Sequence, residues 1–183
     1  LDPQTGKLLG EDNAAIGSRI YHGQWTSPSA GRVDGKWQVY FGGGDGVLYA
    51  LNANPEKGSG NCMAKVLPNQ PDQVEDTELD YIKKLWWVDC VPGDYKAKDG
   101  KPIKYPAAEG PSEINSTPVF YDGKVYVAIG QDPEHGEGVG RLVCVDPSGK
   151  SGDITKGGIV WDYKGIKRSI STVSIDPANG LLF

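Results

Sequence analysis

Four side chains in the segment 130–140, GQDPEHGEGVG, are of the types that hold metal ions. Asp132, Glu134, His135 and Glu137 offer carboxylate oxygens and one imidazole nitrogen, which suit a hard cation and, less well, zinc. Their spacing matches no EF-hand loop, and all four donors are local in the chain. A solvated acidic loop explains the same residues, so the sequence leaves a metal site and a plain acidic loop as alternatives.

A second candidate for chemistry is the glycine-rich stretch Gly42–Gly46, GGGDG, which lies between two apolar runs. A loop that cradles a phosphate needs a Lys-Ser/Thr pair, or a further glycine, leading into a helix. The residues that follow, VLYALNA, carry no such pair and align with the strand-like RLVCV of residues 141–145. We therefore expect these glycines to connect two strands and not to bind a nucleotide.

The three cysteines fit neither a dense disulfide framework nor a CxxC metal site. Cys144 lies in a predicted strand, which indicates a small buried thiol and not a nucleophile. Cys62 and Cys90 belong to one structural unit and its insertion, so a disulfide between them is plausible in an oxidising compartment. Spacing alone does not decide whether their α-carbons come within reach of each other.

The composition indicates an all-β chain of one-domain size. Among 183 residues there are 26 Gly, 13 Pro, five Trp, nine Tyr and three Phe, which are turn formers and strand-favouring aromatics. The net charge of -5, without a dense basic cluster, argues against a nucleic-acid partner, and no apolar run approaches the length of a membrane span. The first residues, LDPQTGKLLG, lack the pattern of a signal peptide and resemble the middle of a structural unit.

An internal repeat in the sequence indicates which strands position these residues. The segment 27–53 aligns with 117–147, so that the pairs Gly35-Lys36 and Val39-Tyr40 correspond to Gly123-Lys124 and Val125-Tyr126, and a third copy opens at 171–183. Each copy predicts strand, tight DG or NG turn, strand, loop and strand. Segments with tryptophan, 83–90 and 157–163, supply a fourth strand to the first two copies.

These motifs resemble the pyrroloquinoline-quinone-type (PQQ-like) β-propeller repeat. The resemblance rests on GKWQVYFGGGDGVLYALNA, on DGKVYVAIG with GRLVCVDPSGK, and on LDPQTGKLLG, although Gly10 stands where the repeat usually has a tryptophan. It implies four-stranded antiparallel propeller blades in an incomplete ring. The expected units are the tail of a preceding blade (1–24), a blade with an insertion at 55–82 (25–90), an inter-blade insertion (91–115), a second blade (116–165) and the start of another (166–183).

In such a ring, the residues just before each innermost strand rim the central channel. The repeat alignment places Glu113 and Arg168 in register and makes Trp25 correspond to Asn115, with His22 nearby. His22, Trp25, Glu113, Asn115 and Arg168 therefore form a predicted polar and aromatic rim, suited to a small molecule or a peptide. An ordinary solvated rim is the alternative, because loops are polar in any case.

The resemblance implies fold more than activity, because the same repeat occurs in enzymes and in binding proteins. We expect a non-catalytic binding or scaffold module in an exported protein, periplasmic or extracellular, without a cofactor. Its partners would be the remaining blades or other protein chains, with a small molecule or glycan as a further ligand. The alternative is a fragment of a quinone-dependent alcohol or sugar dehydrogenase with PQQ and calcium, which in the resembling enzymes requires an adjacent Cys-Cys pair that is absent here.

A carbohydrate-active propeller is the third hypothesis. It would need two inward carboxylates at the mouth of the channel. The repeat alignment supplies only Glu113 there.

Overall fold

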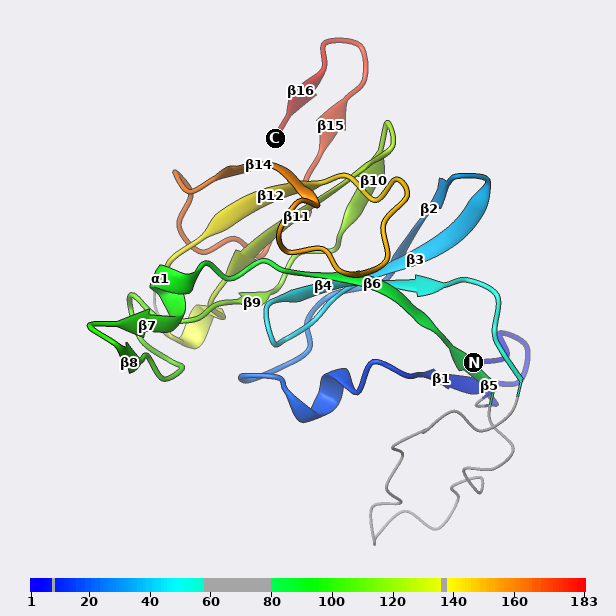
Figure 1. Ribbon diagram of the computed structural model, residues 1–183, viewed down its shortest axis with the longest axis horizontal. Helices are drawn as coiled ribbons and strands as arrows, with labels where there is room; N and C mark the ends of the chain where they lie inside the picture. The colour runs from blue at the N-terminus through cyan, green and yellow to red at the C-terminus, as the bar shows by residue number, and fades with distance from the viewer. Residues whose placement is uncertain (8, 58–79, 136–137) are drawn as a thin grey trace, which may run out of the picture.

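The computed structural model describes residues 1–7, 9–57, 80–135 and 138–183. Over these residues the chain is mostly β-structure, and α1 (Gly93–Lys96) is the one short α-helix among them. The expected predominance of strands is thus confirmed. Two larger sheets lie beside each other and share one hydrophobic core (Figure 1). No helix in the described part of the chain is long and apolar enough to cross a membrane.

The first sheet is an antiparallel meander of β2 (Ser29–Val33), β3 (Lys36–Gly42), β4 (Val47–Asn52) and β6 (Lys84–Asp89). A short strand from the far end of the chain, β13 (Gly152–Asp153), adds to β6 in parallel. The GGGDG loop joins β3 to β4, which confirms that its glycines connect two strands.

The second sheet repeats this arrangement with β10 (Val119–Tyr121), β11 (Lys124–Gly130), β12 (Arg141–Val145) and β14 (Ile159–Tyr163). The short strand β9 (Glu113–Ile114) also pairs with β11. The two strands predicted from tryptophan-bearing segments are therefore present as β6 and β14.

The strand registers confirm that the two sheets are repeats of one unit. In each sheet an aromatic residue, a small residue and a tryptophan lie side by side on three neighbouring strands: Tyr40, Ala50 and Trp86 in the first sheet, and Tyr126, Cys144 and Trp161 in the second. The register of the last strand shifts directly after the small residue in both sheets. Cys144 is 1% exposed, which confirms the predicted buried thiol.

The core lies between unlike faces of the two sheets. The first sheet contributes the face that carries Tyr40 and Trp86, which are both fully buried. The second sheet contributes its opposite face, a set of valines with Ile129, and Phe120 stacks on Tyr40 with ring centroids 5.7 Å apart. The face of the second sheet that corresponds to Tyr40 and Trp86 is partly open, since Trp161 is 41% exposed.

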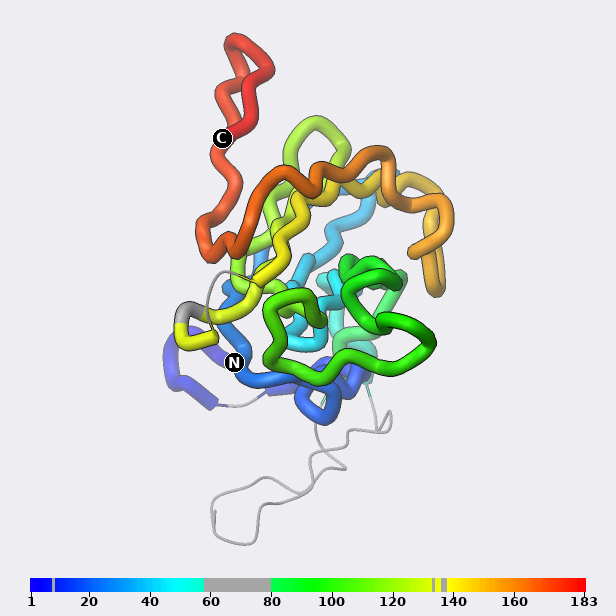
Figure 2. The backbone as a smooth tube through the Cα atoms, turned by 90° about the vertical axis from the view of Figure 1, so that its left-hand side faces the viewer, coloured from blue at the N-terminus to red at the C-terminus, as the bar shows by residue number. Residues whose placement is uncertain are grey.

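Smaller elements cover the outer face of the first sheet and extend its ends. β1 (Gly10–Asp12) pairs in parallel with β5 (Asp80–Ile82), and the 3-10 turn η1 (Ile16–Ser18) packs on Tyr49 and Leu51. The insertion 91–115 holds α1 and the hairpin of β7 (Ala97–Lys98) and β8 (Lys101–Pro102). The hairpin of β15 (Ile175–Asp176) and β16 (Leu181–Leu182) projects from the rest of the molecule (Figure 2).

Trp86→Ala is expected to lower the free energy of unfolding by about 3–5 kcal/mol. The change removes a fully buried ring and leaves the amide oxygen of Gln38 without its indole donor, which lies at 3.0 Å. The matched change at the equivalent position, Trp161→Ala, should cost about 1 kcal/mol or less, because that ring is already partly in water. Urea unfolding followed by circular dichroism measures both, and equal losses would contradict the packing described here.

Candidate functional site

One end of the two sheets, which we call the connection end, holds the link 19–26, the GGGDG loop, the entrance to β9 and the loop after β11. The glycine loop after β3 accepts backbone hydrogen bonds from two of them. The N–H of Tyr21, in the link before β2, donates to the carbonyl of Gly44 at 2.9 Å. The N–H of Ile114, in β9, donates to the carbonyl of Gly43 at 3.2 Å. The loop therefore holds the link 19–26 and the entrance to β9 against the same end of the first sheet.

This close approach explains the glycines. A Cβ at Gly44 would overlap the carbonyl oxygen of Gly23, and a Cβ at Gly46 would come within 2.5 Å of the carbonyl oxygen of Ser112. Gly46 also has φ of +75°, a conformation that side chains disfavour. Both positions need glycine because neighbouring backbone occupies the space where a side chain would stand.

The aspartate of the same loop fixes the start of the link. The carboxylate of Asp45 accepts a hydrogen bond of 2.5 Å from the hydroxyl of Tyr49 and one of 3.2 Å from the guanidinium of Arg19. Arg19 also donates to the Tyr49 hydroxyl at 2.7 Å. Asp45 is 7% exposed, so this pairing satisfies a buried charge and leads the chain towards Tyr21 and His22.

Asp132 is the centre of the polar cluster at this end. It is 1% exposed and lies just before η3 (Pro133–His135), where its Oδ1 accepts from the N–H of Glu134 at 2.8 Å. Its Oδ2 lies 2.5 Å from His135 Nδ1 and also accepts from the hydroxyl of Tyr105. Burial alone would raise the pKa of Asp132, but hydrogen bonds from Tyr105 and His135 outweigh it and lower the pKa to about 2.

Glu113 is the second buried carboxyl group of the cluster. Its side chain is fully buried and contacts the hydroxyl of Tyr105 at 3.4 Å and the N–H of Gly23 at 3.5 Å. Burial raises the pKa of Glu113, the Gly23 N–H opposes that shift, and the charge of Asp132 adds to it. Tyr105 thus bridges two carboxyl groups with pKa values shifted in opposite directions, an arrangement more frequent at functional sites than elsewhere.

Aromatic rings stand beside these acids. Tyr21 stacks on Tyr105 with centroids 5.6 Å apart and an interplanar angle of 11°. His22 lies between Trp25 and Tyr105, with centroid distances of 6.3 Å and 6.4 Å, and meets the ring of His135 edge-on at 5.1 Å. Trp25 is 55% exposed, so it presents an aromatic face to solvent at the edge of the cluster.

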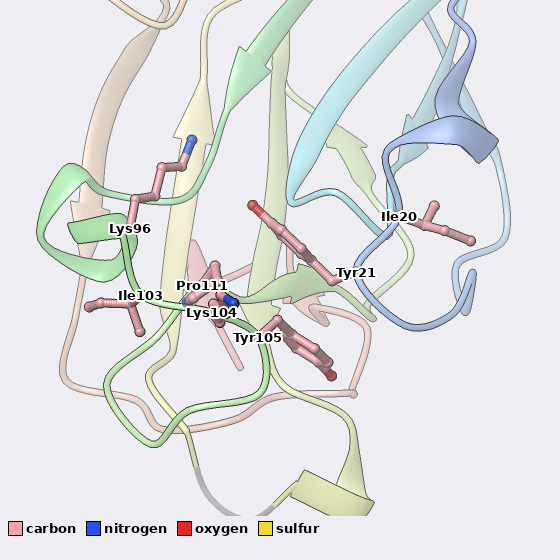
Figure 3. A pocket seen from close by; sticks show the side chains of 7 residues that line it. All are labelled: Ile20, Tyr21, Lys96, Ile103, Lys104, Tyr105 and Pro111. Atoms are coloured by element: carbon pink, nitrogen blue, oxygen red, sulfur yellow. The ribbon is translucent and has the colours of Figure 1, made fainter. Parts of the chain in front are cut away.

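Tyr105 also lines a pocket of about 480 Å³ (Figure 3). It lies between the link before β2 and the insertion 91–115. The residues lining it combine aromatic, apolar and basic side chains: Ile20, Tyr21, Lys96, Ile103, Lys104, Tyr105 and Pro111. The pocket and the carboxyl cluster therefore share the ring of Tyr105.

The structure brings part of the predicted metal loop into this cluster. Asp132 and His135 lie in it, whereas Glu134 is exposed and Glu137 is outside the described residues. Among the described residues, the group with metal-binding geometry is His22, Asp132 and His135, whose ligand atoms all lie within 4.8 Å of one another. A donor from the distant link thus joins two residues of the local set that the sequence predicted.

The predicted rim residues lie at the same end. His22, Trp25 and Glu113 belong to the cluster, and the amide of Asn115 donates to the carbonyl of Gly130 at 3.4 Å. Arg168 is half-buried, and its backbone packs against Gly130. The side-chain oxygen of Asn115 has no hydrogen-bond donor among the described residues.

Sequence reasoning missed Tyr21 and Tyr105. Neither stands in a motif: Tyr105 lies in the insertion 91–115, which has no counterpart in the other repeat, and Tyr21 lies in the link before β2. The predicted Cys62–Cys90 disulfide stays a prediction, since Cys62 lies outside the described residues. Cys90 is fully buried and has no disulfide partner among the described residues.

Comparisons with known proteins assign this chain to no family. No family model matches the sequence, and no curated protein matches it either. The functional reading therefore rests on the residues and contacts described above.

Glu113→Gln should change how stability depends on pH. Because the pKa of Glu113 is raised in the folded protein above its ordinary value of 4.5, the native state binds this proton more tightly than the unfolded chain does. The contribution of Glu113 to the free energy of unfolding is fully present below its ordinary pKa of 4.5. It is lost as the pH rises through the raised pKa of the folded protein. The advantage of Glu113→Gln over wild type should therefore grow as the pH rises from about 4 towards 7.

Urea unfolding of both proteins across this pH range measures the effect. Glu109→Gln is the control, because Glu109 is exposed on the same insertion. Parallel pH curves for wild type and Glu113→Gln would contradict the prediction.

Proposed function

We propose that this chain belongs to the PQQ-like propeller repeat proteins, and that its connection end acts as a non-catalytic binding site. In this proposal the two four-stranded sheets are consecutive blades, and the remaining blades or other protein chains are their partners. The proposal extends to an exported protein, periplasmic or extracellular, as the family resemblance implies.

The head-to-tail packing of the sheets supports the propeller part of the proposal. The Tyr40 and Trp86 face of the first sheet packs against the opposite face of the second. Such a contact between unlike faces leaves a matching face at each end, so further units can add in the same way, and a ring forms where the rotation between units closes. The partly open face around Trp161 is where a third unit would pack by the same rule.

The binding part rests on one observation: stacked aromatic rings adjoin two buried carboxyl groups at one end of the sheets. A carbohydrate presents apolar C–H faces, which pack on rings, and hydroxyl groups, which donate to carboxylates in charge-assisted hydrogen bonds. The exposed ring of Trp25 and the stacked pair Tyr21 and Tyr105 offer the first kind of surface. Glu113 and Asp132 are buried behind these rings, contact the hydroxyl of Tyr105 and make this end negatively charged. The exposed rings therefore carry the argument, and we propose a glycan as the ligand.

The residues fit the alternative, a quinone-dependent dehydrogenase with PQQ and calcium, less well. The adjacent Cys-Cys pair that the resembling enzymes use is not in this sequence. The clustered donors include two imidazoles, whereas calcium takes oxygen ligands. We therefore derive no reaction through that cofactor.

Trp25→Ala is expected to weaken glycan binding by at least about tenfold, because one stacked aromatic contact contributes roughly 1.4 kcal/mol. A panel of neutral and acidic oligosaccharides identifies the ligand, and calorimetry with the best member measures affinity. Trp37→Ala is the matched control, since Trp37 is 56% exposed and lies at the other end of β3. The proposal fails if no oligosaccharide binds, or if both variants lose affinity equally.

Addition of PQQ and calcium should leave no quinone absorbance on the protein after gel filtration. The physical reason is the donor mismatch at the cluster. Dialysed protein without additions serves as the blank. A retained quinone band would favour the dehydrogenase over the binding module.

A further inference from the structure

Three metal-ligating side chains meet at the connection end although the chain separates them widely. Asp132 and His135 stand on the turn η3, and His22 stands on the link before β2. The rings of His22 and His135 are 5.1 Å apart at an angle of 81°, and the ligand atoms of all three residues lie within 4.8 Å of one another. The tertiary fold therefore assembles this group.

We propose that His22, Asp132 and His135 bind one divalent transition-metal ion, and that zinc fits best. Two imidazoles and one carboxylate are the donor types of three-ligand zinc sites. Ligand atoms around a tetrahedral zinc ion stand ~3.3 Å apart, as bond lengths near 2.0 Å require. Asp132 Oδ2 and His135 Nδ1 lie closer than this, at 2.5 Å, and no two ligand atoms of the group are more than 4.8 Å apart. Shifts of at most about 1.5 Å, within reach of side-chain rotations, therefore produce the zinc geometry.

The surroundings favour a metal over a simple ion pair. Tyr105 donates to Asp132 and lies 3.3 Å from His135 Nδ1, so it orients two of the three ligands. Hydrogen bonds of this kind, made to the ligands and not to the metal, are regular features of metal sites. Glu113, fully buried beside Tyr105, adds negative charge when ionised and strengthens attraction for a cation.

Three protein ligands leave one position of a tetrahedral zinc ion open. Water or an oxygen of a bound molecule fills that position in sites of this type. The open position would give the connection end a polar anchor beside the exposed ring of Trp25. The metal site does not depend on the proposed glycan, because its ligands all come from the protein.

The test is calorimetric titration of Zn²⁺ into metal-free protein without a histidine tag. Wild type should bind one ion per chain, and His22→Gln and Asp132→Asn should each lower the affinity at least about tenfold. Co²⁺ provides a second readout, because a site with His and carboxylate ligands gives visible absorption that His22→Gln should abolish. His22 is exposed, so its substitution tests the site even if Asp132→Asn does not fold.

Glu134→Gln is the matched control on the same turn, since Glu134 is exposed and outside the three-residue group. It should bind zinc as wild type does. The proposal is overturned if wild type binds no zinc, if His22→Gln binds it equally well, or if Glu134→Gln loses binding as His22→Gln does. Glycan binding by metal-free protein is measured in parallel, so failure of the metal site and failure of the glycan site are separate results.

Discussion

The close approach of three backbone segments at the GGGDG loop is the constraint on which the rest of this structure depends. Gly44 and Gly46 stand where the link before β2 and the entrance to β9 leave no room for a side chain. Asp45 then pairs with Arg19 and sets the direction of the link. His22 and Glu113 meet because these segments are held against one strand end.

The packing of the two sheets against each other also depends on which of their faces meet. The core joins the face of the first sheet that carries Tyr40 and Trp86 to the face of the second sheet that carries valines with Ile129 and Phe120. The face of the second sheet that corresponds to Tyr40 and Trp86 is partly open at Trp161. The candidate site lies where the connections of both sheets meet, so inter-sheet packing also fixes its geometry.

Within the site, Tyr105 lies between two carboxyl groups whose pKa values burial shifts in the same direction but whose hydrogen bonds differ. Its hydroxyl contacts both Asp132 and Glu113, and burial raises the pKa of Glu113 while hydrogen bonds lower that of Asp132. The pKa of Asp132 is thereby lowered while that of Glu113 is raised. Two neighbouring carboxyl groups with different pKa values suit a site that accepts hydrogen bonds from a polar ligand or holds a cation.

The sequence by itself determined the strands, the repeat and the end of the sheets at which polar loops gather, because apolar alternation and DG turns are local signals. It placed Asp132 and His135 together, since they are neighbours on one turn. Only the tertiary structure added His22 to them and brought Tyr21 and Tyr105 into contact. Those meetings depend on backbone contacts between segments up to about a hundred residues apart, and no local pattern encodes them.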